Sequence, residues 1–250
     1  MNLFSAFFYR RLVTITHNWV GELSISLLLP IGIYSTLGFG LSNSTPSLEY
    51  FPKLSWLIPG IILIISFAGA LITIFNDIMK NKRITSLYGT LYASPSSLAT
   101  SVFGITSSVL PEGIARAILG LIILEFIIGY AFSALGQILF LFIIIFSTLI
   151  GASIGLTLGI LSKNSLSNQL VILLLLLGLG FCSGWFIPLE VFPESIQTIL
   201  RILPTTVLGE CSRAVLFGQI FPFSLLFIPV GTIGIFFLLN ILLFPIISTE

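Results

Sequence analysis

The feature that most constrains this chain is a series of long apolar windows, each long enough to cross a bilayer. A spanning helix needs about 20 mostly apolar residues, and six windows meet that requirement. They are, to within a few residues, Val20–Leu41, Trp56–Asn76, Ser107–Ala131, Gln137–Leu161, Gln169–Ile187 and Phe223–Ile247. The sequence therefore predicts an all-α polytopic membrane protein with six transmembrane helices, formed by residues 1–250 as a single transmembrane domain.

The composition excludes an ordinary soluble domain. Of the 250 residues, 56% are hydrophobic and 8% are charged, whereas soluble domains carry about 25% charged residues. So few charged side chains cannot cover a soluble surface of this size. A single histidine, His17, excludes a histidine-based metal cluster, and the two cysteines, Cys182 and Cys211, give no disulfide framework. We expect no bound metal.

The positions of the basic residues predict the orientation. An even number of spans places both ends of the chain on one side of the membrane. With a cytoplasmic N-terminus, the basic residues divide into Arg10, Arg11, Lys80, Lys82, Arg83 and Lys163 inside, and Lys53, Arg201 and Arg213 outside. Arg116 lies within a span. The excess of Lys and Arg on the inner side favours this orientation.

The N-terminal stretch is amphipathic when it is drawn as a helix. One face carries Phe4, Phe8, Leu12, Ile15 and Trp19. The opposite face carries Arg10, Thr14, His17, Asn18 and Gly21. This pattern predicts a helix that lies in the membrane interface, although a polar lead-in to the first span is an alternative.

The segment between the last two spans, "FCSGWFIPLEVFPESIQTIL", is too apolar for a loop and too interrupted for a span. Pro188, Pro193 and Pro204 divide it, and a proline ends one helix or begins the next. Glu190 and Glu194 fall where the first turn of a short helix favours an acidic side chain. We predict short re-entrant helices that enter from the outside; an amphipathic loop on the outer surface is the alternative.

The third window is unusual because it contains charges. Glu112 and Arg116 are four residues apart, so they share one face of a helix and can pair there. Glu125 points roughly the other way, and Pro111 would kink the span. Charged residues within spans usually face a bundle interior or a pathway. A structural pair that locks two helices together is the alternative.

The fourth window carries small residues at every fourth position: Ser147, Gly151, Gly155 and Gly159. Such a stripe lets another helix approach closely. We predict helix packing, either within the chain or between two copies; a hinge is the alternative.

Motifs for catalysis are missing from the sequence. It has no G-x-x-x-x-G-K-[ST] phosphate loop, no H-E-x-x-H and no G-x-S-x-G. We therefore expect neither ATP hydrolysis nor another enzymatic activity by this chain.

One segment resembles a known family. The stretch "SGWFIPLEVFPESIQTILRILPTTVLGECSRAVLFG", from Ser183 to Gly218, is similar to the outer segment of type-2 export permeases of ATP-binding-cassette transporters. The loop "ITSLYGTLYASPSSL" is similar to that family's cytoplasmic stretch before the third span, although the family commonly reads Arg-x-x-Gly-Thr-Leu and the residues after Arg83 lack that glycine. The resemblance extends over essentially the whole chain.

The resemblance implies a permease that works with partners. A second copy or a similar permease would complete the pathway, and separate ATPase subunits would bind the ATP, so we expect no cofactor on this chain. The implied ATPase-docking residues are Arg10, Arg11, Asp77, Lys80, Lys82 and Arg83. The implied pathway or outer-gate residues are Glu112, Arg116, Glu125, Trp185, Phe186, Pro188 and Glu190.

The resemblance and the composition together indicate a substrate class and a type of membrane. The family moves drugs, lipids and lipid-linked sugar polymers, and 23 phenylalanines with few charges suit an amphiphile. We expect a hydrophobic, lipid-like or drug-like substrate, with a sugar polymer second, in a bacterial inner membrane or a plastid membrane. An ion-coupled secondary transporter or a channel is the alternative function.

Overall fold

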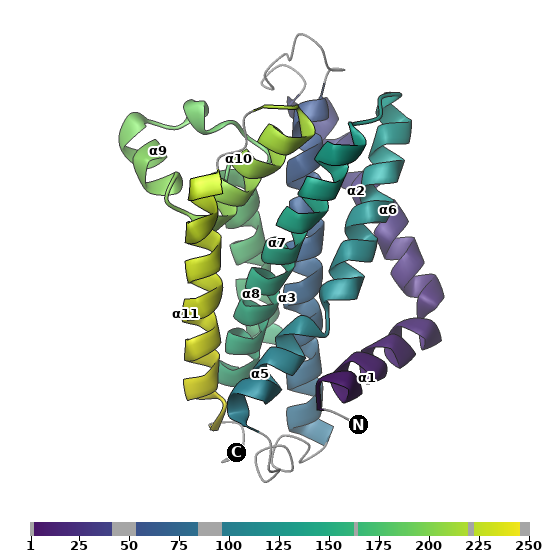
Figure 1. Ribbon diagram of the computed structural model, residues 1–250, viewed down its shortest axis with the longest axis vertical. Coiled ribbons are helices and arrows are strands. Elements are labelled where there is room, and N and C mark those ends of the chain that lie inside the picture. The colour runs from purple at the N-terminus through teal and green to yellow at the C-terminus, as the bar shows by residue number, and fades with distance from the viewer. Residues whose placement is uncertain (1–2, 42–53, 85–96, 163–164, 220–222, 246–250) are drawn as a thin grey trace.

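The computed structural model describes residues 3–41, 54–84, 97–162, 165–219 and 223–245, and all regular structure in these ranges is helical (Figure 1). The helices, with η marking a 3-10 turn, are α1 (Leu3–His17), α2 (Trp19–Leu41), η1 (Ser55–Leu57), α3 (Ile58–Ile84), α5 (Leu98–Ser107), α6 (Leu110–Ile128), α7 (Ala134–Leu161), α8 (Ser165–Cys182), η2 (Leu189–Val191), α9 (Glu194–Leu200), α10 (Pro204–Leu216), η3 (Phe223–Leu226) and α11 (Phe227–Leu243). The all-α prediction is confirmed for this part of the chain.

Four stretches of helix are long and apolar enough to cross a membrane, among the residues that the structure describes. They are Trp19–Gly40, Ser55–Lys82, Ala134–Leu161 and Phe223–Leu243. The third and fifth predicted spans are represented by α6 and α8, which are shorter than the windows that predicted them. The protein is therefore an integral membrane protein of at least four candidate spans.

The third predicted span differs from the expectation at Pro111. The window Ser107–Ala131 was expected to form one helix kinked at this proline, but α5 ends at Ser107 and α6 begins at Leu110, so Pro111 occupies the first turn of a new helix. A proline fits there because the first N–H groups of a helix have no partner within the helix. The break thus comes before the proline, and α5 runs at an angle to α6 (Figure 1).

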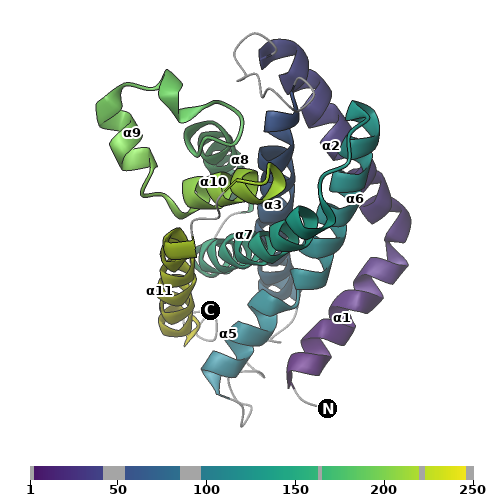
Figure 2. The ribbon, with the colours of Figure 1, turned by 45° about the horizontal axis from the view of Figure 1, so that its top comes forward.

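The fifth predicted span ends early, at Cys182 instead of Ile187. Gly184 has φ +69°, a left-handed conformation that glycine adopts without strain. The chain then turns through η2 and α9 into α10 at one end of the bundle (Figure 2). The predicted proline positions agree with these elements, since Pro188 precedes η2, Pro193 precedes α9 and Pro204 begins α10.

Helix α3 occupies the middle of the bundle and contacts α2, α6, α7, α8 and α10. Its neighbour α7 approaches most closely along the predicted small-residue stripe. A Cβ at Gly151 would lie 2.4 Å from the carbonyl oxygen of Phe67, and a Cβ at Gly155 would lie 2.4 Å from that of Leu71. Gly159 lies against the Ile78 side chain in the same way. The stripe therefore packs within the chain, against α3.

Helix α1 lies across one end of the bundle and bends into α2 near Asn18 (Figures 1 and 2). Helical hydrogen bonds continue through the bend, from Asn18 N to Thr14 O and from Glu22 N to Asn18 O. The start of α1 and the end of α11 lie at the same end, opposite η2, α9 and α10 (Figure 1). Leu12 and Trp19 of the predicted apolar face are exposed in the structure, and the placement of α1 in the membrane interface stays a prediction.

Candidate functional site

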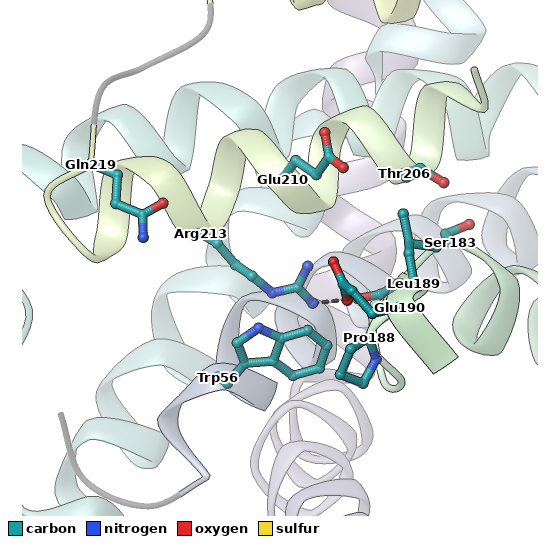
Figure 3. A pocket seen from close by; sticks show the side chains of 10 residues that line it. Trp56, Ser183, Pro188, Leu189, Glu190, Thr206, Glu210, Arg213 and Gln219 are labelled. Atoms are coloured by element: carbon teal, nitrogen blue, oxygen red, sulfur yellow. Dashed lines mark hydrogen bonds between the residues drawn. The ribbon is translucent and has the colours of Figure 1, made fainter. Parts of the chain in front are cut away.

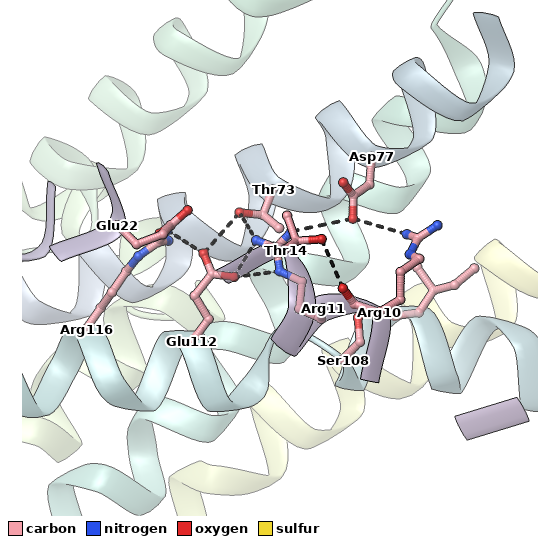
Figure 4. Close-up of polar contacts among 10 residues, drawn as sticks. Arg10, Arg11, Thr14, Glu22, Thr73, Asp77, Ser108, Glu112 and Arg116 are labelled. Atoms are coloured by element: carbon pink, nitrogen blue, oxygen red, sulfur yellow. Dashed lines mark hydrogen bonds and ion pairs between the residues drawn. The ribbon is translucent and has the colours of Figure 1, made fainter. Parts of the chain in front are cut away.

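A cluster of six charged residues joins α1, α2, α3 and α6 (Figure 4). Its cations are Arg10, Arg11 and Arg116, and its anions are Glu22, Asp77 and Glu112. Three positive and three negative charges balance. Because charged side chains in a bundle are tolerated when they pair, this balance explains how so many charges fit among apolar helices.

Glu112 is the central acceptor of the charged cluster. It is 6% exposed and pairs with Arg116, as the four-residue spacing predicts. Arg11 Nε–H also donates to Glu112 Oε2 at 2.8 Å, and the Thr73 hydroxyl donates to Oε1 at 3.4 Å. Glu112 therefore ties α1 and α3 to α6, so the pair is more than a contact within one helix.

Arg116 has a second carboxylate partner on the first spanning helix. Its Nη2 lies 2.6 Å from Glu22 Oε2, while its Nε is buried and has no hydrogen-bond partner. Sequence reasoning missed Glu22. The available signal was a lone carboxylate in one apolar window and a lone arginine in another, which must find partners inside the bundle.

The predicted docking residues divide between those held by the bundle and those on its surface. Arg11 turns into the charged cluster with its side chain 11% exposed, and Arg10 pairs with Asp77 at 3.4 Å. Lys82 Nζ donates to Ile160 O at 2.7 Å, at the end of α7. Lys80 is exposed. Arg83 lies in the last turn of α3, and the structure does not describe its side chain.

Glu125 does not belong to the charged cluster that contains Glu112 and Arg116. It lies at the end of α6 and accepts from Phe132 N and from Gln137 Nε2, both at 2.8 Å. It thereby braces the α6–α7 turn, where Gly129 has φ +67°. The carboxylate of Glu125 thus holds this turn, and its place in a pathway stays a prediction.

An apolar groove of about 660 Å³ lies between α2, α3 and α8. Its walls are formed by Ile25, Leu29, Ile33, Thr36, Leu37, Ile64, Ile65, Ala68, Gly69, Ile72, Thr73, Leu173, Leu176, Leu177, Phe181 and Phe186. Arg116 reaches it from α6 and is the one charged residue among the described residues that line it. This volume falls in the range of small-molecule sites.

The segment from Ser183 to Gly218 is anchored by Trp185, which is fully buried. Its Nε1–H donates to Thr205 O at 2.8 Å, and its ring meets Phe67 edge to face at 6.0 Å. Gly60 of α3 and Gly209 of α10 leave space for it, since a Cβ at Gly209 would lie 2.8 Å from the indole. Phe186 is also buried, at 6% exposure.

A second, polar pocket of about 310 Å³ opens beside this anchor and includes Pro188 and Glu190 among its lining residues (Figure 3). Arg213 lies 3.8 Å above the Trp56 ring and donates to Gly184 O. Burial lowers the pKa of Arg213 to about 9, so it stays cationic at neutral pH and keeps its cation–π contact. Sequence reasoning missed Trp56 and Arg213, which no local spacing connects.

The two cysteines are free in the structure, with Cys182 half-buried and Cys211 buried. No group of three or more potential metal ligands occurs among the described residues.

No curated protein matches the chain. A family model described as ABC-2 type transporter matches residues 2–217, a range that takes in the charged cluster, the apolar groove and the helices through α10. The chain therefore belongs to the ABC-2 type transporter family and is an integral membrane permease.

Proposed function

We propose that this chain is the membrane-spanning subunit of an ATP-driven exporter, and that its apolar groove carries a hydrophobic, lipid-like or drug-like substrate. The groove between α2, α3 and α8 is the observation that supports this proposal most directly. It is lined almost entirely by aliphatic and aromatic side chains and has the volume of a small-molecule site. A sugar polymer, the second choice of substrate, would need a more polar lining.

We infer that the chain crosses the membrane six times, with α6 and α8 as the two shorter crossings. At 1.5 Å per residue, helices of 19 and 18 residues extend about 28 and 27 Å, close to the hydrocarbon thickness of about 30 Å. The charges of α6 are paired within the chain, which lowers the cost of placing them there. Six crossings agree with the start of α1 and the end of α11 lying at one end of the bundle (Figure 1).

The short helices at the opposite end would form the outer gate. Proline residues define their starts, and η2 and α9 have only three and seven residues, so they have little stability of their own. Trp185 and Phe186 would close the pathway below them, and Pro188 and Glu190 would border the gate. Re-entry of this segment into the membrane is part of the proposal.

The energy would come from a separate ATPase subunit that binds ATP, together with a second copy of this chain or a similar permease. The ATPase would dock at the end of the bundle that carries α1, with Arg10, and the end of α3, the helix on which Lys80, Lys82 and Arg83 are positioned. Charged surface residues chiefly set encounter rate and register in such contacts. The absence of a phosphate loop from the sequence agrees with this division of labour.

The test is reconstitution of the chain with an ATP-binding-cassette ATPase subunit that co-purifies with it, followed by measurement of ATP-dependent extrusion of a lipophilic dye. We expect no ATP hydrolysis by the chain alone, and extrusion only with an active ATPase. Reversal of Lys80, Lys82 and Arg83 to Glu should weaken co-purification of the ATPase, whereas Arg201→Glu, a reversal on the exposed outer segment, should not. Dye movement driven by an ion gradient without ATP would instead indicate a secondary transporter.

A further inference from the structure

We propose that Arg116 is an anion-binding residue in the apolar groove, so that the groove takes an amphiphile with a negatively charged headgroup. This inference names the substrate class of the transport site and rests on the proposed function. The groove gives an apolar volume for the hydrocarbon part, and Arg116 is the charged residue among its described lining residues. A guanidinium matches the geometry of phosphate and carboxylate groups.

The guanidinium has unused bonding capacity. Arginine has five N–H donors, and both carboxylate partners of Arg116, Glu22 and Glu112, meet the same nitrogen, Nη2. Its Nε is buried without any hydrogen-bond partner, and the whole residue is 8% exposed. A buried donor without an acceptor is costly, more so on a charged group. An anion can reach this nitrogen once Arg116 turns toward the groove, and an oxygen of that anion would then remove the cost.

The two carboxylate partners differ in how firmly they are held. Glu112 is 6% exposed and is also bound by Arg11 and Thr73, so it stays in place if Arg116 moves toward a ligand. The side chain of Glu22 is 30% exposed, and Arg116 is its one ion-pair partner in the described part of the chain. Glu22 is therefore the exchangeable partner.

Charge balance favours an anion over a cation. The charged cluster of Arg10, Arg11, Arg116, Glu22, Asp77 and Glu112 is neutral while Glu22 takes part, and it carries one positive charge when Glu22 swings away. An anionic headgroup at Arg116 restores neutrality in an environment of low dielectric constant, where an uncompensated charge is unfavourable. A cationic headgroup would add a second positive charge.

Gly69 lies next to the proposed site and leaves room for the guanidinium. A Cβ at Gly69 would lie 2.1 Å from Arg116 Nη1, and Gly69 is itself a lining residue of the groove. Because Gly69 has no side chain, the guanidinium of Arg116 can lie directly against α3 at the groove wall. A larger residue at this position would have to push the guanidinium aside.

The test measures binding to the purified chain in a neutral maltoside detergent, without any ATPase. The probes are dodecyl phosphate, dodecyltrimethylammonium and inorganic phosphate, read by thermal-shift titration and by equilibrium binding. We expect saturable binding and stabilisation by dodecyl phosphate only. Equal binding of the cationic amphiphile would overturn the role of charge, and equal binding of inorganic phosphate would overturn the role of the apolar groove.

Two variants move binding in opposite directions. Arg116→Gln should weaken dodecyl phosphate binding about tenfold or more, the value of a lost charge-assisted hydrogen bond. Glu22→Gln should strengthen it, because it removes the competing carboxylate and keeps Arg116. Glu194→Gln on exposed α9 changes the net charge by the same amount and should leave binding unchanged, which controls for overall charge.

The outcomes separate this inference from the proposed function. If Arg116→Gln does not fold, Glu22→Gln decides, and unchanged or weaker binding by that variant would overturn the inference. Dye extrusion with ATP but no selectivity among the three probes would leave the exporter intact and refute the anion site. Selective binding of dodecyl phosphate without any ATP-dependent extrusion would refute the exporter and retain the site.

Discussion

Replacement of Gly155 by alanine tests how closely α3 and α7 must approach. The new Cβ would lie 2.4 Å from Leu71 O, whereas carbon–oxygen contacts are about 3.3–3.6 Å. The obstacle is backbone, so it cannot rotate away, and the helices must separate by about 1 Å. Gaps of that size forfeit a quarter to a half of each van der Waals contact. We expect a loss of about 1–3 kcal/mol, as for other overpacked sites.

The assay is thermal unfolding of the detergent-purified protein, with Gly234→Ala as the matched control. Gly234 also lies in an apolar helix, α11, but a Cβ there would meet nothing within 4 Å. The control should be neutral or gain up to about 1 kcal/mol from helix propensity. Equal melting temperatures for Gly155→Ala and the control would refute the reasoning.

The double variant Gly151→Ala/Gly155→Ala gives a second check on the same contact. A Cβ at Gly151 would lie 2.4 Å from Phe67 O, on the same face of α3. One displacement of α3 would relieve both clashes, so the combined cost should be smaller than the sum of the single costs. Additive costs would show that the helices deform locally at each site instead.

Two further predictions concern other buried groups. Asn240 is fully buried between α11 and α7, where its side chain donates to Ser153 O at 3.0 Å and accepts from the Thr157 hydroxyl at 2.9 Å. Asn240→Ala should lower the free energy of unfolding in detergent by about 0.6–1.7 kcal/mol. An unchanged free energy of unfolding would contradict this prediction. Burial raises the pKa of the Cys211 thiol to about 11, so the reactive thiolate is scarce below that pH. In a Cys182→Ser variant, which removes the other free thiol, Cys211 should resist a maleimide at neutral pH in the folded protein and react after denaturation. Rapid labelling of that folded variant would refute this.

The helices of this fold could be predicted from the sequence wherever local chemistry determines them. Apolar windows locate the long helices, and the fixed φ of proline explains why Pro193 and Pro204 come where α9 and α10 begin. The same rule applied to Pro111 gave a kink in place of a helix start. Periodicity alone could not show that the chain breaks at Ser108 and Val109, because both residues are compatible with a helix.

The candidate site was less predictable because its partners come from distant parts of the sequence. The spacing of Glu112 and Arg116 on one helix predicts their pairing, since both positions lie on one face. The additional partners Arg11 and Glu22 are 101 and 94 residues away from the groups that they bind. Only the packing of α2 against α6, and of α1 against α5 just before α6, brings them together, and no local pattern encodes that packing.

The packing also indicates which helices can move relative to one another. At Gly151 and Gly155 the backbones of α3 and α7 are too close for even a methyl group, and a well-packed contact of this kind does not deform continuously. The groove, in contrast, separates α3 from parts of α2 and α8 whose apolar side chains remain exposed, such as Leu28 and Leu174. Helix α3 contacts Trp185 through Gly60, near the end of the bundle that carries α10, and carries Asp77 of the charged cluster near the opposite end. A rearrangement that opens the groove would therefore move α2 and α8 relative to a rigid α3–α7 pair. The contacts that would change at the two ends of that pair are the charged cluster and the contacts of Trp185.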